Sequence, residues 1–143
     1  MVQGHMKRLP NWRARLAAEM DRQCRIGFDW GRHDCVLGLA AGAVEAVTGQ
    51  DLRRGWRGKY RSAAGAQKAL SKSGFADLGA AVASVLPEIH PSRAHVGDIG
   101  LIPAEGAVGA SLCVVDASGL IVLTETGHGR RPRSDMTRAF KVG

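Results

Sequence analysis

Asp34 and Cys35 are the neighbouring residues whose types and position are best suited to chemistry. They follow the aromatic and glycine loop 28–31 and come directly before a long apolar segment. Asp34 suits the N-cap of a helix, because its carboxylate can accept hydrogen bonds from the free N–H groups of the first turn. Cys35 would then lie at the positive end of the helix dipole, which stabilises a thiolate and lowers the thiol pKa. This arrangement is typical of a cysteine nucleophile.

A cysteine nucleophile needs a base within hydrogen-bond reach, and two histidines are candidates. His128, in the glycine-rich loop expected at 126–129, is the preferred base for Cys35, and His33 is the second choice. In such a site the backbone N–H of Cys35 would help to bind the oxyanion. The alternative interpretation makes Cys35 a small apolar core residue. The spacing of Cys24, His33 and Cys35 fits no standard zinc pattern, so we expect no metal and no cofactor.

The first half of the chain is expected to be helical. Apolar positions recur at helical spacing from residue 12 to 24, and segment 35–48 is apolar or small on every side apart from Glu45. The second segment therefore predicts a buried helix, with Gly49 as the left-handed residue that ends it. Two further helices are expected over 63–71 and 77–86.

The second half of the chain has a sequence pattern typical of β-strands. Short apolar runs separated by turn residues predict strands over 98–102, 108–115, 120–124 and 139–142, with a hairpin turn at 116–119. Helices that precede an antiparallel sheet predict an α+β fold.

Length and composition indicate one domain. The chain of 143 residues is long enough for a core of its own, and its three cysteines do not suggest a disulfide framework. We interpret residues 1–6 as a tag remnant or a disordered N-terminus and residues 7–143 as the domain. The N-terminus lacks the apolar core of a signal peptide, and no apolar run reaches the ~18 residues of a membrane span.

The net charge is +7, from 20 Lys and Arg against 13 Asp and Glu. Arginines beside aromatic residues can bind phosphates, stack on bases or anchor a protein partner. The candidate binding residues are Trp30, Trp56, Arg57, Arg130, Arg131 and Arg133. Without a recognisable nucleic-acid module, a surface that faces a protein or an anionic cell-wall polymer is favoured over one that binds nucleic acid.

The order of these motifs resembles that of the NlpC-type cell-wall peptidases, which are papain-like cysteine hydrolases. The resemblance rests on Asp34-Cys35 after Trp30-Gly31, on the Gly97-Asp98 pair before an apolar strand, and on Val108-Gly109. Segments 48–51 and 56–60 are similar to small NlpC-like domains of phage and prophage tail modules. The resemblance implies an NlpC fold and a place in a virion tail, at the tail tip or baseplate, after synthesis in the bacterial cytoplasm. It also implies other tail proteins and peptidoglycan as partners, and membership of a symmetric oligomer.

Three of the family's motifs are changed in this chain. Ala107 stands where the catalytic histidine is expected, Phe28 replaces a tyrosine that assists the oxyanion, and Val36-Leu37 replaces a Ser-Gly pair. Losing the base removes several orders of magnitude of rate. We therefore expect a degenerate peptidase with a structural or wall-docking role. The alternatives are an active peptidoglycan endopeptidase with Cys35 as nucleophile and, with less support, a basic nucleic-acid-binding module.

Overall fold

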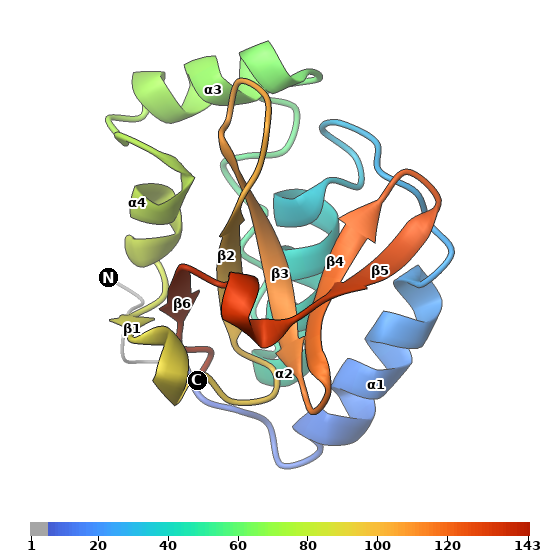
Figure 1. Ribbon diagram of the computed structural model, residues 1–143. Helices are drawn as coiled ribbons and strands as arrows, with labels where there is room; N and C mark the ends of the chain where they lie inside the picture. Colours follow the sequence, from blue (N-terminus) through green and yellow to red (C-terminus); the bar gives the residue numbers. More distant parts are fainter. Residues whose placement is uncertain (1–5) are drawn as a thin grey trace.

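The computed structural model describes residues 6–143, which form an α+β fold with four α-helices and one six-stranded sheet (Figure 1). The helices are α1 (Trp12–Gln23), α2 (Ala41–Thr48), α3 (Ala63–Lys72) and α4 (Leu78–Ala83). A π-helical turn, η1 (Cys35–Ala40), leads directly into α2. This confirms the predicted α+β class and the continuous buried helical segment.

The strands are β1 (Glu88–Ile89), β2 (Ile99–Pro103), β3 (Ala110–Asp116), β4 (Gly119–Thr124), β5 (Gly127–Arg131) and β6 (Arg138–Phe140). Their order in the sheet is β1-β6-β2-β3-β4-β5, and every pair is antiparallel. Short 3₁₀ turns, η2 (Pro91–Arg93) and η3 (Arg133–Asp135), precede β2 and β6.

Strand β5 corrects the prediction that residues 126–129 form a glycine-rich loop. His128 pairs with Leu123 of β4, and Gly129 pairs with Val122. The ladder of β4 supplies hydrogen-bond partners that override the low strand propensity of glycine. Because His128 is part of the sheet, its position is set by backbone pairing.

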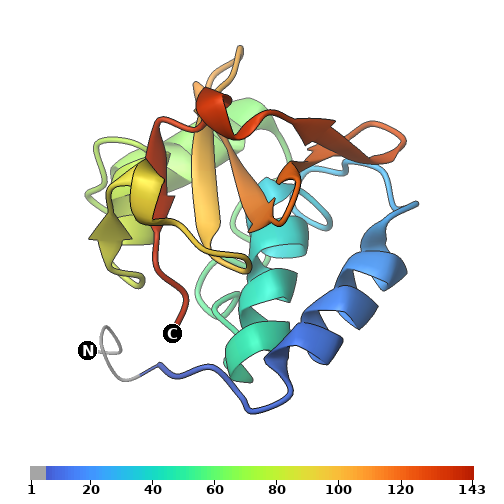
Figure 2. The same cartoon turned by 60° about the horizontal axis from the view of Figure 1, so that its bottom comes forward.

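The main core lies between one face of the sheet and the helical layer. It includes Leu39, Val44 and Val47 from η1 and α2, and Ile99 and Phe140 from the sheet. Figure 2 shows α1 and α2 side by side. The sheet lies across the N-terminal end of the continuous η1–α2 segment. A smaller cluster that includes Cys113 and Leu120 covers the other face, and Cys113 has no exposed surface.

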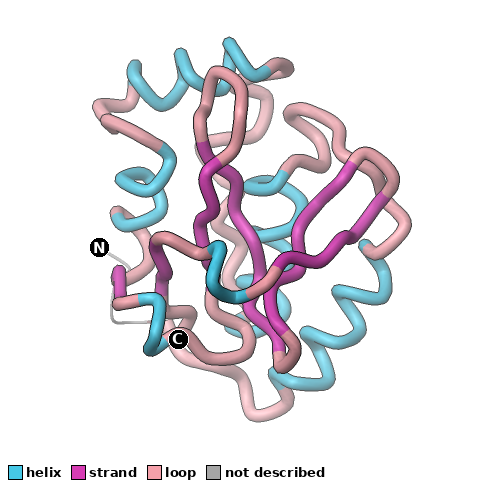
Figure 3. The backbone as a smooth tube through the Cα atoms, viewed as in Figure 1, coloured by secondary structure: helices cyan, strands magenta, loops and turns pink. Residues whose placement is uncertain are grey.

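Local signals account for several boundaries. Gly49 has a φ of 81° and ends α2, as predicted, because glycine adopts the left-handed conformation without steric cost. Asp116 pairs with Gly119 across a two-residue turn, which confirms the predicted hairpin. Long connections join α2 to α3 and β2 to β3, and the second of these reaches toward α3 (Figure 3). The two connections frame the region around Cys35.

The segment interpreted as a tag remnant lies largely outside the described residues, which begin at Met6. Met6 itself is buried in the main core, and the Leu9 N–H donates to the carbonyl of Val47. The chain is therefore integrated into the domain from residue 6 onward.

Candidate functional site

Asp34 organises the start of the helical segment that carries Cys35. Its carboxylate accepts hydrogen bonds from the backbone N–H groups of Val36 at 2.9 Å, Leu37 at 2.8 Å and Gly31 at 3.0 Å. The side chain is buried, with 1% of the residue exposed. The predicted N-cap is therefore present, and it also ties the preceding loop to the helix start.

The Cys35 thiol is buried in the main core, with 7% of the residue exposed. Burial raises its pKa to about 11, and the charge of Asp34 acts in the same direction, whereas contacts with Leu112 and Ser111 of β3 oppose the shift. The expectation of a lowered thiol pKa is therefore wrong. Desolvation of a thiolate among apolar side chains outweighs the helix dipole, so Cys35 is a neutral thiol at physiological pH.

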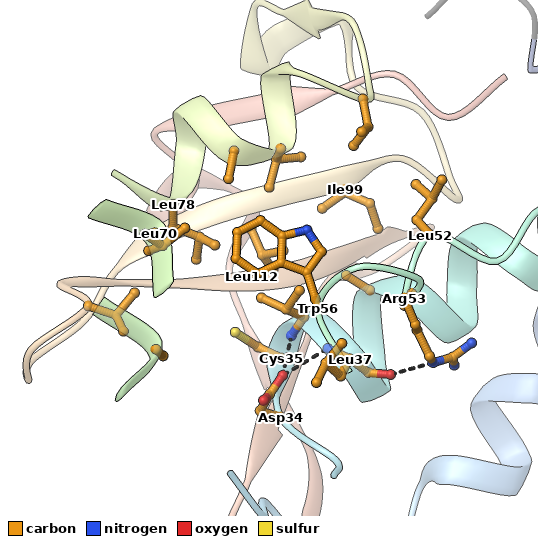
Figure 4. A pocket seen from close by; sticks show the side chains of 18 of the residues that line it. Asp34, Cys35, Leu37, Leu52, Arg53, Trp56, Leu70, Leu78, Ile99 and Leu112 are labelled. Carbon is orange, nitrogen blue, oxygen red and sulfur yellow. Dashed lines mark hydrogen bonds between the residues drawn. The ribbon is translucent and has the colours of Figure 1, made fainter. Parts of the chain in front are cut away.

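An apolar pocket of about 100 Å³ opens beside Cys35, between η1 and α2 on one side and α3, α4 and the sheet on the other. Figure 4 shows the indole of Trp56 among the apolar side chains that line it. These side chains include Leu52, Leu70, Leu78, Ile99 and Leu112. Arg53 closes the rim by donating to the Leu37 carbonyl at 2.6 Å and to Glu45 at 2.9 Å. The surroundings of Cys35 are thus suited to apolar contact.

Tyr60 is a residue of this region that the sequence interpretation missed. Its hydroxyl faces Asp34, and burial, followed by the charge of Asp34, raises the tyrosine pKa. The Trp30 ring stacks edge-on against both Phe28 and Tyr60, with centroid distances of 4.8 and 6.3 Å. A phenol hydroxyl is therefore present near the helix start although position 28 lacks one. Tyr60 is the only tyrosine of the chain, and that was the one available signal.

One of the two candidate bases, His128, contacts a buried glutamine of α1. His128 Nε2 lies 3.4 Å from Oε1 of Gln23, a side chain of α1 with no exposed surface. The amide of Gln23 donates to Glu19 at 2.6 Å and to the carbonyl of Gly38 at 3.1 Å. The imidazole of His33 packs against Gly38. A side chain at position 38 would collide with this ring.

Burial lowers the pKa of both histidines. His33 Nε2 is buried without a hydrogen-bond partner, and burial, followed by the charge of Arg22, lowers the pKa of this imidazole. Burial, followed by the proximity of His33, lowers the pKa of His128. The structure thus directs the Nε2 of His128 to Gln23 and places His33 against Gly38, close to His128.

Ala107, where the resemblance implied a catalytic histidine, lies exposed in the loop between β2 and β3. The next residue, Val108, lines the pocket together with Ala110 and Leu112. Strand β3 therefore presents methyl and isobutyl groups to the pocket beside Cys35.

Most of the predicted binding arginines take part in bonds within the domain. Arg130 pairs with Asp116 at 2.6 Å and Arg131 with Asp135 at 2.7 Å. Arg133 donates to the carbonyls of Pro91 at 3.0 Å and Ala94 at 2.6 Å. Arg57 remains mostly exposed, although it contacts Asp51 at 3.3 Å. Trp30 and Trp56 are half-buried and pack against the core around Tyr60.

No group of three or more metal-binding side chains occurs within residues 6–143. None of the described helices is long and apolar enough to cross a membrane.

The burial of Cys35 predicts a slow reaction with thiol reagents. At pH 8 a thiol with a pKa near 11 is only about one part in a thousand thiolate, and Cys113 is buried with a pKa raised to about 12. In a Cys24→Ser variant, which lacks the exposed thiol, we expect native protein to react with a disulfide reagent at least about 100-fold more slowly than unfolded protein. The reaction should accelerate as the pH rises toward 11.

Wild-type protein is the control, and it should show one additional fast thiol, Cys24. Rapid labelling of one thiol in native Cys24→Ser protein at pH 7, absent from the Cys24→Ser/Cys35→Ala variant, would contradict the neutral state of Cys35.

Comparison with known proteins gives one match. Residues 7–142 match the family described as a domain of unknown function, DUF6950. No curated protein and no solved structure matches the chain. Since the match spans nearly every residue of the described domain, this protein belongs to the DUF6950 family.

Proposed function

We propose that this protein is a degenerate, non-catalytic domain of the papain-like NlpC type that serves as a structural or wall-docking part of a phage or prophage tail, at the tail tip or baseplate. The observation that carries the non-catalytic assignment is the neutral thiol of Cys35, buried in apolar surroundings while His128 bonds to Gln23. A cysteine peptidase needs a thiolate–imidazole pair, because the imidazole activates the thiol and later protonates the leaving amine.

The order of elements supports the architectural part of the proposal. A buried helical segment begins with Asp34-Cys35 and packs against an antiparallel sheet, and β3 contributes Ser111 and Leu112 to the surroundings of the thiol. This is the arrangement that the resemblance to NlpC peptidases implies. The place in a tail rests on the resemblance of segments 48–51 and 56–60 to tail-module domains.

The docking surface of this proposal is the loop around Trp56 and Arg57. Arg57 exposes 63% of its side chain, and Gly55 and Gly58 on either side adopt positive φ values of 92° and 75°. The loop therefore presents a cationic side chain outside the core, while the Trp56 ring anchors the loop on the pocket. Such a surface suits an acidic tail protein or an anionic wall polymer.

Two substitutions in the tail-producing phage or prophage test the proposal. Cys35→Ala should leave tail assembly and infectivity unchanged, and the purified wild-type protein should release no fragments from peptidoglycan. Arg57→Glu should strongly reduce the number of assembled tails, because it reverses the charge of the docking loop without disturbing the core. Particle counts by electron microscopy and plaque titres are the measurements.

Lys72→Glu, on the exposed face of α3, is the matched control for charge reversal and should assemble normally. Loss of infectivity on Cys35→Ala, accompanied by loss of a peptidoglycan-cleaving activity, would instead support the endopeptidase alternative, and loss of that activity on His128→Ala would then identify the base. Normal assembly of Arg57→Glu would remove the docking role of the loop.

A further inference from the structure

A second concave site lies at the end of the molecule where the two ends of the described chain meet. The segment that enters α1, the loop that precedes β2 and the residues after β6 surround it, and Figure 2 shows the first and last of these at the same end of the molecule. Its volume is about 570 Å³. We call it the basic groove, lined by Arg8, Trp12, Arg13, Ile89, Arg93, His95, Val96, Asp98, Lys141 and Gly143. It shares no lining residue with the pocket beside Cys35.

The single carboxylate side chain of the groove is already saturated. Asp98 accepts hydrogen bonds from Arg8 at 3.0 Å, from the His95 N–H at 2.8 Å and from the Val142 N–H at 2.9 Å. Arg8 also donates to the carbonyls of Val142 and Val96, at 2.9 and 2.7 Å. Arg8 and Asp98 therefore form a charge-neutral floor.

Three further cations surround this floor without a carboxylate partner among residues 6–143. Arg13, Arg93 and Lys141 are exposed, and each comes from a different segment of the chain. Arg13 stands over the Trp12 ring, at 4.4 Å from its centroid. Four cationic side chains and one carboxylate side chain thus line the groove, a balance that favours an anionic ligand.

The size and lining of the groove indicate which class of anionic ligand fits it. A groove of this volume is larger than a single phosphate, and cations from three segments suit several phosphates in succession. The guanidinium groups of Arg8 and Arg13 stand over the Trp12 ring at 4.2 and 4.4 Å, so the ring is not free to stack on a base. The groove also lacks an exposed aromatic anchor of the kind that dominates protein interfaces.

We propose that the basic groove binds a chain of phosphodiester-linked units without aromatic bases, of the kind found in phosphate-rich wall polymers, through Arg13, Arg93 and Lys141. The choice of a wall polymer rests on the proposed docking function. The affinity of the groove for phosphates does not rest on that function. It is measured on the purified protein, so its outcome is independent of the assays of tail assembly and peptidoglycan cleavage.

Calorimetric titration of the full chain with short-chain inorganic polyphosphate tests the proposal. The Arg13→Gln/Arg93→Gln/Lys141→Gln variant should bind at least about tenfold more weakly at low salt, and the slope of log K against log salt should fall by about 2, as expected for three lost phosphate contacts. The matched control is Arg61→Gln/Lys68→Gln/Lys72→Gln, which removes the same charge from exposed residues outside the groove. It should bind like wild type.

Each other outcome overturns the proposal. Equal weakening in both triple variants, or no binding at low salt, would show that the groove is not a site. Tighter binding of single-stranded DNA of equal charge would show a nucleic-acid surface, and equal binding of polyglutamate would remove the preference for phosphate. If the triple variant does not fold, the double variant Arg93→Gln/Lys141→Gln, which keeps the contact of Arg13 with Trp12, replaces it. Its affinity for polyphosphate is then compared with that of the control variant.

Discussion

Replacing Asp98 with alanine is expected to destabilise the fold by about 3–5 kcal/mol, because it leaves a partly buried guanidinium and two backbone N–H groups without their acceptor. Asp98 is 1% exposed, and its carboxylate joins three segments: Arg8 near the start of the domain, His95 before β2, and Val142 after β6. Its loss therefore removes bonds that tie both ends of the described chain to the loop before β2. The midpoint of urea unfolding, followed by circular dichroism, measures the effect.

Asp116→Ala is the matched control for Asp98→Ala. Asp116 also pairs with an arginine, the exposed Arg130, and accepts the N–H of Ser118 in the hairpin turn. The loss of this ion pair and turn bond should cost about 1–2 kcal/mol. Adding Arg8→Met to Asp98→Ala should recover part of the lost stability, because the unpaired charge is then removed. Equal unfolding midpoints for Asp98→Ala and Asp116→Ala would contradict the structural role of Asp98.

Replacing Asp34 with alanine is the second substitution expected to have a large effect, about 3–4 kcal/mol of destabilisation. A helix cap alone contributes about 1 kcal/mol, and each buried N–H that loses its acceptor adds about 1 kcal/mol or more. Asp34 serves Gly31, Val36 and Leu37 at once in a buried position. Chemical denaturation measures this loss. The control Asp77→Ala removes the exposed cap of α4, with its bond from the Ala80 N–H and a surface contact to Arg138 at 3.4 Å, and should cost only about 1–2 kcal/mol.

The same variant has a spectroscopic consequence at Tyr60. Burial and the charge of Asp34 both raise the pKa of this hydroxyl, so removing Asp34 should lower the tyrosine pKa while leaving it above its ordinary value. Because Tyr60 is the only tyrosine, alkaline titration of the phenolate absorbance reports on this site alone. An unchanged titration in folded Asp34→Ala protein would contradict the proximity of the two side chains.

Local rules were sufficient for the features that depend on neighbouring residues. The N-cap at Asp34, the end of α2 at Gly49 and the hairpin between Asp116 and Gly119 each follow from the conformational preference of one or two residues. The pairing of Asp98 with Arg8, 90 positions away, is not such a feature, because it joins distant parts of the chain.

Strand β5 and the histidine network show where sequence patterns fail. The segment Gly127–Arg131 has a composition typical of a loop. It forms a strand because its backbone pairs with the neighbouring strand β4. His128 then meets Gln23, which is 105 positions away and completely buried on α1. Neither contact leaves a periodic signal, because each depends on which elements the fold places side by side.

By itself, the sequence determined that a cysteine begins a buried helical segment behind an aspartate cap, because helix starts are set by local hydrogen bonding. Only the tertiary structure decided the chemical state of that cysteine. Leu112 of β3, Leu70 of α3 and Leu78 of α4 enclose the pocket beside Cys35 from distant parts of the chain. Their combined burial keeps the thiol neutral against the helix dipole, because the cost of desolvating a charge depends on everything that surrounds it.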